Sequence, residues 1–348
     1  MKILVTGTEG YIGARLAPWL EAAGHEVTGL DIGFYGDGRL YHDPLAARLG
    51  ARTLYKDLRT VEPADFAGFD AVIHLAELSN DPLGQNRPEI TMKINHEGSV
   101  RIAQAAREAG VKRFVYASSC SVYGVGAGDA GAFLDERSPV NPQTAYAVCK
   151  TLVERDVTPM ASRDFSVVFL RNATAYGPSP RMRFDIVLND LCALARTTGR
   201  IAMVSDGSPW RPIVHVEDIC EAMRCAVEAP ADAINGEVFN VGRTDENFRV
   251  REIAALVAAA FPGCEVSAGP PSADNRSYRV SFEKIETRLP GFVARWTAKR
   301  GAEELASLFQ RIDFTEADHR WRAYTRLKQL QYLQRTGQVD EDLYWSAR

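Results

Sequence analysis

The feature that most constrains this chain is a glycine-rich turn at residues 6–13 (TGTEGYIG), which follows a β-branched stretch at residues 2–6. Glycines let a strand turn tightly into a helix and let the backbone approach a ligand closely. At the N-terminus of that helix, free backbone N–H groups and the helix dipole favour a bound diphosphate. The strand before the turn and the helix after it distinguish the pattern from an ordinary turn, so it predicts a phosphate-binding site.

Asp31 makes a dinucleotide the expected ligand of this site. It ends the next hydrophobic stretch, 18 positions after Gly13, where a carboxylate binds the ribose hydroxyls of an adenosine. A carboxylate also repels the 2′-phosphate of NADP, and residues 32–35 contain no arginine to offset it. The predicted cofactor is therefore NAD.

Short β-branched stretches alternate with alanine-rich helical stretches, which is the pattern of a parallel sheet with helices on both faces. We predict strands at residues 2–6, 26–30, 52–55, 71–75, 114–117, 166–170 and 238–241, and helices at 11–23, 89–109, 142–160 and 216–229. The predicted fold class is α/β, a Rossmann-type doubly wound parallel sheet with a smaller, discontinuous C-terminal substrate-binding region. Its ligand crevice should lie at the carboxyl ends of the strands.

The rhythm of the pattern also suggests how the chain divides. Residues 1–177 and 213–242 are expected to form the NAD-binding domain, and residues 178–212 and 243–312 the substrate-binding region. Residues 313–348 are expected to form a helical tail rich in Arg, Gln, Tyr and Leu. Packing or a dimer contact is the role that we favour for this tail, and folding over the site is the alternative. In that alternative, the basic segment at residues 319–328 (HRWRAYTRLK) would form a helix over the diphosphate.

Composition excludes several classes of protein. The 348 residues are 46% hydrophobic and 25% charged, with a net charge of −4, which suits a large core without disulfide or metal staples. That charge gives no global attraction for nucleic acid, and no apolar run approaches the roughly 20 residues of a membrane span. The six cysteines are scattered without zinc spacing, and the first strand lies where a signal peptide would begin. We therefore expect a cytoplasmic protein that binds no nucleic acid, no membrane and no metal.

A tyrosine and a lysine form the candidate chemical centre. Tyr146 and Lys150 are four residues apart, so they would share one face of a helix. A free tyrosine titrates near pH 10, and an adjacent cation such as Lys150 is needed to make it a base at neutral pH. Such pairs also occur on ordinary surfaces, but this helix follows a serine-rich segment at residues 118–124 (SSCSVYG) that ends the fifth predicted strand. That position favours catalysis.

Together these segments resemble the extended short-chain dehydrogenase/reductases, and among them the nucleotide-sugar epimerase/dehydratase family typified by UDP-galactose 4-epimerase. The resemblance extends to about residue 300. It rests on the glycine-rich turn, Asp31, residues 74–76 (HLA), Asn95, the serine-rich segment, the Tyr146 and Lys150 pair, and residues 170–178 and 211–218. It implies an NAD cofactor, a nucleotide-diphosphate sugar as substrate, and a homodimer.

The resemblance gives each motif an expected role. Tyr146 takes the proton of a sugar hydroxyl, Lys150 binds the nicotinamide ribose and lowers the pKa of Tyr146, and Ser119 hydrogen-bonds the reacting oxygen. His74 is expected to pack rather than to catalyse. The residues expected to bind the cofactor are Gly7, Gly10, Tyr11, Ile12, Gly13, Asp31, Asp57, Leu58, Leu75, Ala76, Asn95, Tyr146 and Lys150. For Asp57 and Leu58 the alternative is a capped loop, and for residues 74–77 (HLAE) it is a buried strand end.

Polar residues after the fifth strand are the expected substrate contacts. They are Ser119, Ser121, Thr174, Arg183, Asn189, Arg211 and Arg276. An arginine recognises a phosphate by two parallel hydrogen bonds, which favours this role for Arg211 over a surface ion pair. Thr174 replaces the asparagine of many family members. Residues 270–274 lack the family's leading arginine, and Arg276 or Arg279 would replace that contact.

Two departures from the family pattern bear on the reaction. Members that dehydrate the sugar place an Asp-Glu pair after the active-site threonine, and decarboxylating members place a glutamate at the second position; here the residues are Cys120 and Ser121. The resemblance thus favours an NAD-dependent epimerase, in which a ring hydroxyl is oxidised to a transient ketone and the same hydride returns. A nucleotide-sugar dehydrogenase or ketoreductase with net redox is the alternative. The intact set of Ser119, Tyr146 and Lys150 disfavours a non-catalytic NAD sensor.

Overall fold

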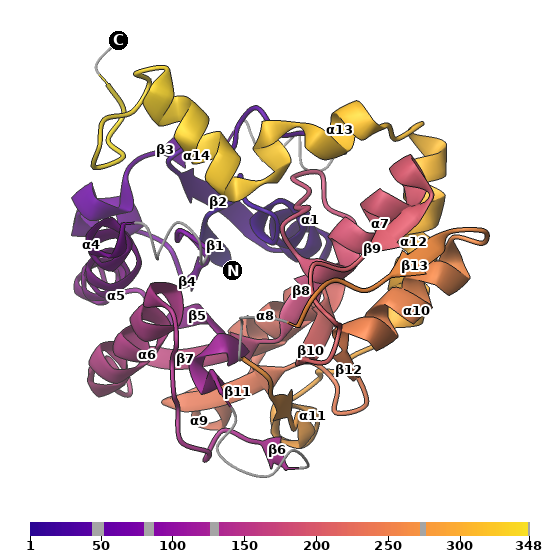
Figure 1. Ribbon diagram of the computed structural model, residues 1–348. Helices are drawn as coiled ribbons and strands as arrows, with labels where there is room; N and C mark the ends of the chain where they lie inside the picture. The colour runs from indigo at the N-terminus through magenta and orange to yellow at the C-terminus, as the bar shows by residue number, and fades with distance from the viewer. Residues whose placement is uncertain (44–51, 80–86, 126–131, 272–275, 347–348) are drawn as a thin grey trace.

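The computed structural model describes residues 1–43, 52–79, 87–125, 132–271 and 276–346, and its centre is a seven-stranded parallel sheet (Figure 1). The strands, in spatial order, are β11 (Glu237–Val241), β7 (Ser166–Asn172), β5 (Arg113–Ser119), β4 (Ala71–His74), β1 (Lys2–Thr6), β2 (Glu26–Asp31) and β3 (Thr53–Tyr55). Every strand predicted for this sheet is present, so the α/β class and the doubly wound sheet are confirmed. The order reverses between β1 and β4, and ligands bind at such a switch point, outside the carboxyl ends of the strands.

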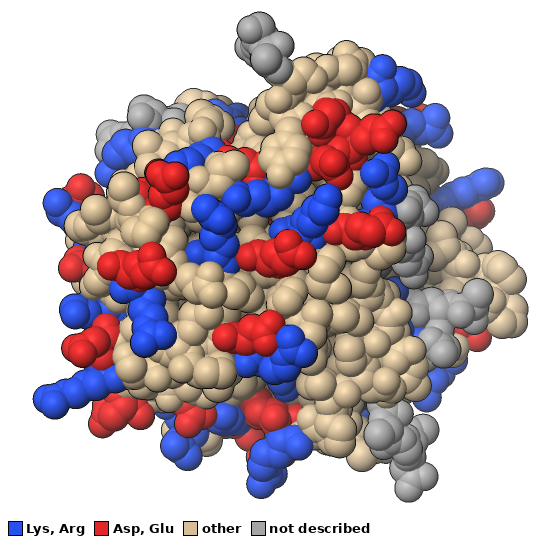
Figure 2. Space-filling view, turned by 90° about the vertical axis from the view of Figure 1, so that its left-hand side faces the viewer, with Lys and Arg blue, Asp and Glu red and all other residues tan. Residues whose placement is uncertain are grey.

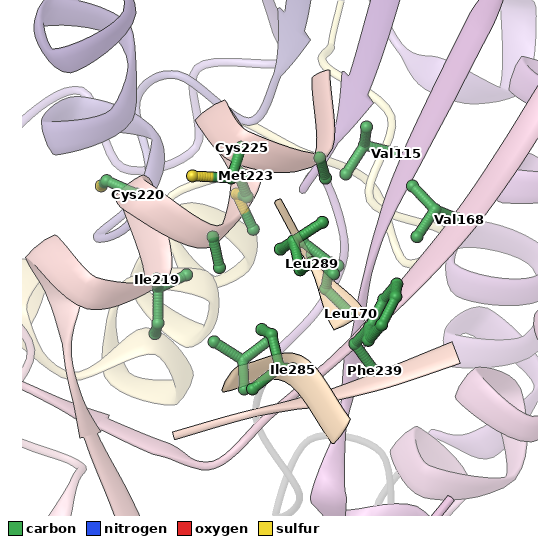
Figure 3. Packing of buried hydrophobic residues seen from close by; sticks show 14 of the residues in the cluster. Val115, Val168, Leu170, Ile219, Cys220, Met223, Cys225, Phe239, Ile285 and Leu289 are labelled. Carbon is green, nitrogen blue, oxygen red and sulfur yellow. The ribbon is translucent and has the colours of Figure 1, made fainter. Parts of the chain in front are cut away.

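The strands of this sheet are apolar on both faces, because helices cover the sheet twice. On β1, Ile3 and Val5 belong to one core layer and Leu4 to the other. The first layer includes α1 (Gly13–Ala22), α8 (Val216–Glu228) and α11 (Glu283–Arg288). Figure 3 shows part of it, with Leu170 of β7 and Ile219 of α8 among the buried side chains. The second layer includes α5 (Ser99–Glu108), α6 (Ala145–Val157) and α14 (Arg326–Arg335).

One predicted helix differs in the structure. Residues 89–109 form not one helix but three segments: α4 (Pro88–Thr91), a π-helical stretch (Met92–Gly98) and α5. In the π-helical stretch, the Asn95 amide accepts a hydrogen bond from Leu78 N at 2.8 Å and donates one to Leu78 O at 3.0 Å. This tertiary contact accompanies the widened turn, and the periodicity of a single segment does not reveal it.

The remaining strands form three small sheets. A three-stranded sheet contains β8 (Thr174–Tyr176), β10 (Trp210–His215) and β12 (Asn247–Arg249), while β9 (Arg200–Ala202) pairs with β13 (Glu265–Ser267) and β6 (Phe133–Leu134) with β14 (Arg279–Val280). The other helices are α7 (Val187–Thr198), α9 (Ala231–Ile234), α10 (Val250–Ala260), α12 (Ala298–Arg311) and α13 (Glu316–Arg320). Of these, α7, α10 and α12 share a third core cluster. The division into domains stays a prediction.

The surface and helix lengths can be compared with the expectations from composition. Acidic and basic side chains are interspersed over the face shown in Figure 2, in keeping with a net charge near zero. Among the helices of the described ranges, none combines the length and apolar character that crossing a bilayer requires.

The C-terminal tail returns to the large sheet instead of extending away from it. Leu330 and Leu333 of α14 are buried in the second core layer. Gln329 Nε2 donates to Phe34 O at 3.0 Å, and Trp345 Nε1 donates to Ile32 O at 2.7 Å. The tail, partly helical as predicted, therefore packs on the loop that follows β2. A dimer contact through the tail stays a prediction.

Candidate active site

A cleft of about 950 Å³ lies at the carboxyl ends of the large sheet, across the switch point between β1 and β4. The residues that line it come from many separate segments of the chain, of which the first contains Gly7 and the last Arg326. Of the site residues predicted from the sequence, all line this cleft except Asn95 and Asn189. The cleft is therefore the place to test each predicted role.

The glycine-rich turn forms one end of the cleft. Gly7 has a φ of +80° and donates its N–H to Leu30 O at 2.8 Å, while Gly10 N donates to Gly7 O at 3.0 Å. A side-chain Cβ on Gly13 would overlap Gly7 O and its carbonyl carbon. Close packing of the helix start against the turn therefore requires glycine at this position. Tyr11 and Ile12 line the cleft beside the turn.

Asp31 ends β2 beside the glycine-rich turn. Its carboxylate accepts a hydrogen bond from Glu9 N at 2.9 Å and from Gly33 N at 2.7 Å. Burial raises its pKa to about 6, although the backbone bonds and the positive charge of Arg326 act in the opposite direction. Asp31 is thus ionised at neutral pH and faces the cleft.

The next two predicted pairs line the same cleft. Asp57 caps a short 3₁₀ turn by accepting from Arg59 N at 2.8 Å, as the capped-loop alternative expects, while it and Leu58 also line the cleft. Leu75 N and Ala76 N each donate to Thr6 Oγ1 at 3.1 Å, which ties the end of β4 to β1. Asp57 can therefore cap its turn and line the cleft at the same time.

Tyr146 and Lys150 lie on the face of α6 that borders the cleft. The helix starts where the Thr144 hydroxyl accepts from Ala147 N at 3.2 Å, a typical N-cap. Lys150 is buried, donates to Ala117 O, and holds its Nζ 5.3 Å from the centre of the Tyr146 ring. The pair therefore has the arrangement expected of a phenol beside an ammonium.

Glu77 ends the segment at residues 74–77 and belongs to this centre, although no role of its own was assigned to it from the sequence. Its carboxylate lies 2.8 Å from Lys150 Nζ and accepts from the Tyr116 hydroxyl at 2.5 Å and the Ser99 hydroxyl at 3.2 Å. Burial lowers the pKa of Lys150, but Glu77 and Tyr146 outweigh this and raise it above its usual value. The lysine is accordingly held as a cation.

The serine-rich segment presents hydroxyls to the cleft and turns its thiol away. Ser119 Oγ accepts from Ser121 N at 3.1 Å, which leaves its own proton to donate. Ser121 Oγ is buried, lines the cleft and has no hydrogen-bond partner within the described ranges. Cys120 is 1% exposed, and its thiol donates to Arg171 O at 3.1 Å. Burial raises the pKa of this thiol well above its usual value.

His74 and Asn95 support the cleft from behind. His74 is fully buried, with Nδ1 2.6 Å from Thr6 Oγ1 and Nε2 2.8 Å from Ser99 Oγ. Burial and the positive charge of Lys150 lower its pKa to about 3, so it packs as a neutral ring. Asn95 is fully buried and does not line the cleft. Cofactor contact by Asn95 stays a prediction.

The predicted substrate residues fall into two groups. Thr174, Arg183, Arg211 and Arg276 line the cleft. Asn189 does not, because its amide accepts from Gly177 N at 3.0 Å and donates to the Tyr11 hydroxyl and to Arg183 O, each at 3.2 Å. Residues 272–274 of the atypical 270–274 segment lie outside the described residues. Within the described ranges, no three His, Cys, Asp or Glu side chains gather as metal ligands.

The cleft fits NAD on its own geometry. The glycine turn leaves no room for a Cβ at Gly13, which permits close approach of a diphosphate, and Asp31 is placed for ribose hydroxyls. Lys150 lines the same cleft, and contact with the nicotinamide ribose is its predicted role. Apart from Asn95, the predicted cofactor residues thus line one cleft.

Arg326 is a second cleft residue to which no role of its own was assigned from the sequence. It lies on α14 and lines the cleft although it is far from the other site motifs in the sequence. The signal for it was the basic segment at residues 319–328, and the signal for Glu77 was the segment at residues 74–77 that it ends.

Comparison with known proteins agrees with this geometry. The model of the NAD dependent epimerase/dehydratase family matches residues 3–242. A UDP-glucose 4-epimerase from Mycolicibacterium smegmatis is 31% identical over 75% of this chain and 82% of its own length. A UDP-N-acetyl-alpha-D-glucosaminuronate decarboxylase from Bacillus cytotoxicus is 28% identical over 83% and 88%.

Solved structures extend the comparison. MoeE5, solved in complex with UDP-glucose and NAD, is 28% identical and superimposes with a TM-score of 0.74 over 89% of this chain and 99% of its own. The relatives thus include an epimerase and a decarboxylase, and one similar structure was solved with NAD bound. The chain belongs to the NAD dependent epimerase/dehydratase family, and its cofactor is NAD.

Proposed function

We propose that this enzyme is an NAD-dependent nucleotide-sugar epimerase that inverts a hydroxyl-bearing carbon through a transient keto-sugar. The observation that carries the proposal is the cleft face formed by Ser119, Tyr146 and Lys150, next to positions 120 and 121 that offer no titratable group to the cleft. Such a centre can move one proton and one hydride, and it lacks the acid and base that an elimination needs at those positions.

Tyr146 is the proposed base. A phenol with an unshifted pKa near 10 is protonated at neutral pH, and the Lys150 ammonium 5.3 Å from the ring centre favours its ionised form. Ser119, whose proton is available, would donate to the reacting oxygen and hold it near Tyr146. When bound, NAD supplies the acceptor and then the donor of the sugar's hydride.

Cys120 argues against dehydration. Its thiol is buried, bonded to Arg171 O and turned away from the cleft. Ser121 does line the cleft, yet a hydroxyl is a hydrogen-bond partner and not an acid for elimination. The unsatisfied Ser121 Oγ supports a contact with the sugar.

The substrate's nucleotide diphosphate would lie along the arginines of the cleft. Arg183, Arg211 and Arg276 come from three separate segments and line one cleft, and planar guanidinium groups bind phosphate oxygens in pairs. Thr174 would contact the sugar or the nucleotide beside them. Asn189 is the remaining predicted contact, and it would need to exchange one of its present hydrogen bonds to take this role.

We also infer a homodimer and a cytoplasmic location. The six cysteines all fall in the described ranges and none is in a disulfide, which supports a reducing compartment. The dimer rests on the family resemblance, and sedimentation velocity of the purified protein would test it.

The test of the function is turnover without added cofactor. Purified protein is incubated with a panel of UDP-, GDP-, dTDP-, ADP- and CDP-sugars, and each mixture is followed by NMR and chromatography because an epimer has the mass of its substrate. A new isomer is expected, and a matched Tyr146→Phe variant should form it far more slowly. A product that gains or loses hydrogen, formed when NAD(H) or NADP(H) is supplied, would establish a dehydrogenase or ketoreductase instead. Equal activity of the Tyr146→Phe variant would remove the proposed mechanism.

A further inference from the structure

Arg326 is a buried cation whose guanidinium forms no ion pair with a carboxylate among the described residues. Its residue is 2% exposed, and within the described chain its guanidinium donates to two carbonyls, Ala323 O at 3.2 Å and Arg181 O at 3.4 Å. The guanidinium lies 4.1 Å from the centre of the Tyr35 ring. Burial and the nearby charge of Arg183 lower its pKa to about 10. A buried charge of this kind is costly unless an anion compensates it.

Two other buried arginines and one partly buried arginine show how such charges are compensated in this protein. Arg171 contacts Glu154 at 2.6 Å, Arg183 contacts Asp185 at 2.8 Å, and Arg181 forms a short ion pair with Glu9. By contrast, the backbone N–H of Arg326 is the group that donates to Asp185 Oδ2, at 3.3 Å. Asp185 and Tyr35 act on the Arg326 charge electrostatically and offset part of the effect of burial. The guanidinium therefore keeps donors that a negative ligand in the cleft could accept.

The position of Arg326 identifies that negative group. The residue lines the cleft together with Asp31 and Tyr35 at the end of β2, and its charge acts directly on Asp31. Asp31 is the expected partner of the adenosine ribose, and in NAD that ribose is bonded directly to the diphosphate. A cation that shares the cleft with Asp31 and acts on its charge is therefore placed to meet phosphate oxygens.

We propose that Arg326 is a cofactor-binding residue, supplied by the C-terminal helix, whose guanidinium contacts the diphosphate of NAD. The tail is then a wall of the cofactor site and not an appendage. The hydrogen bonds from Gln329 to Phe34 O and from Trp345 to Ile32 O hold this wall against the loop after β2. Because the proposal concerns only the binding of NAD, its test does not depend on which sugar reaction the enzyme performs.

The test compares two ligands that differ by the diphosphate. Nucleotide-free protein is titrated calorimetrically with ADP-ribose and with adenosine, for the wild type and for Arg326→Met, which keeps a long side chain against Tyr35. Losing charge-assisted hydrogen bonds to phosphate should weaken ADP-ribose binding roughly tenfold or more. Adenosine binding should change by less than about twofold, since adenosine has no phosphate for the guanidinium to contact.

Two further variants keep the test decisive. Arg326→Lys retains the charge without the planar fork, so ADP-ribose binding should be intermediate; it also carries the comparison if the methionine variant does not fold. Arg320→Met, at an exposed arginine of α13 in the same tail, should bind both ligands as the wild type does.

Three results would overturn the proposal. Unchanged ADP-ribose binding by Arg326→Met would show that no phosphate contact exists. Equal weakening of adenosine and ADP-ribose would show that Arg326 merely shapes the pocket. When the same titration of Arg326→Met is made with NAD and with NADP, a loss of affinity for NADP without a loss for NAD would place the anion on the ribose 2′-oxygen and not on the diphosphate.

Discussion

Replacing Glu77 with glutamine should destabilise the enzyme through Lys150. The two side chains are 2% and 4% exposed and lie 2.8 Å apart, so the substitution leaves a buried ammonium without its counter-ion. Removing one partner of a buried pair typically costs about 3–5 kcal/mol. Glutamine still offers a carbonyl to the Tyr116 hydroxyl, so we expect a loss at the lower end of this range, about 3 kcal/mol. That is a large fraction of the free energy of unfolding of a typical protein, about 5–15 kcal/mol.

The sign of the pH dependence follows from the same lysine. In the wild type its pKa is raised, so the stability that the pair contributes is present below the unfolded pKa of about 10.4 and is lost as the pH rises through the folded value. In the Glu77→Gln variant, burial acts without the carboxylate and lowers this pKa below that of the unfolded chain. The unfolded state then binds more protons, and stability rises with pH. The deficit should be largest near pH 7 and smaller at about pH 9.

The assay is urea denaturation of wild type and variant, in the same cofactor state, at these two pH values. Glu286→Gln, at an exposed glutamate of α11, is the matched control and should change stability by less than about 0.5 kcal/mol. Adding Lys150→Met to Glu77→Gln should recover much of the loss, because no unpaired charge remains. A loss below about 1 kcal/mol at pH 7, or one that does not shrink with rising pH, would refute the reasoning.

Three further predictions concern the cofactor and the base. Gly13→Ala should abolish NAD retention, because its Cβ would overlap Gly7 O; nucleotide released on denaturation measures this, and retention at the wild-type level contradicts it. Burial raises the pKa of Asp31 to about 6, and the ionised form accepts the ribose hydroxyls, so NAD affinity should rise with pH through about 6 in the wild type. In Asp31→Asn calorimetry should show no such rise. Tyr146→Phe should slow turnover roughly 10²–10⁴-fold with NAD retention unchanged; comparable loss of NAD would indicate a structural role instead.

The cofactor half of the site could be predicted because its signals are local. The glycine turn, Asp31 and the tyrosine-lysine spacing each lie within one strand, turn or helix, and the fold brings them to one cleft by the topology that such a pattern implies. The direction in which a polar side chain of a helix points was harder to predict. Asn189 lies on α7, where its amide forms hydrogen bonds with Gly177 N and the Tyr11 hydroxyl. The sequence shows that this residue is polar but does not show whether its side chain faces the cleft.

Glu77 and Arg326 could not be given individual roles from the sequence, although the segments that contain them, at residues 74–77 and 319–328, stood out. Glu77 meets Lys150 across the junction of a strand and a helix, and Arg326 reaches the cleft from a distant part of the chain. Both contacts depend on tertiary packing, so the sequence does not show which side chain of each segment enters the cleft. The tail shows the same limit, since its composition fits a helix but not the surface on which the helix lies.

The way the tail closes the cleft has a consequence for synthesis. The hydrogen bond between Gln329 and Phe34 joins positions 295 apart, so the first-made and last-made parts of the chain meet at the adenosine end. At about 5–20 residues per second, ribosomes need roughly 15–60 s to travel that distance. The glycine turn and Asp31 are therefore synthesised before α14, which covers this part of the cleft. We expect stable binding of the nucleotide only after α14 has left the ribosome.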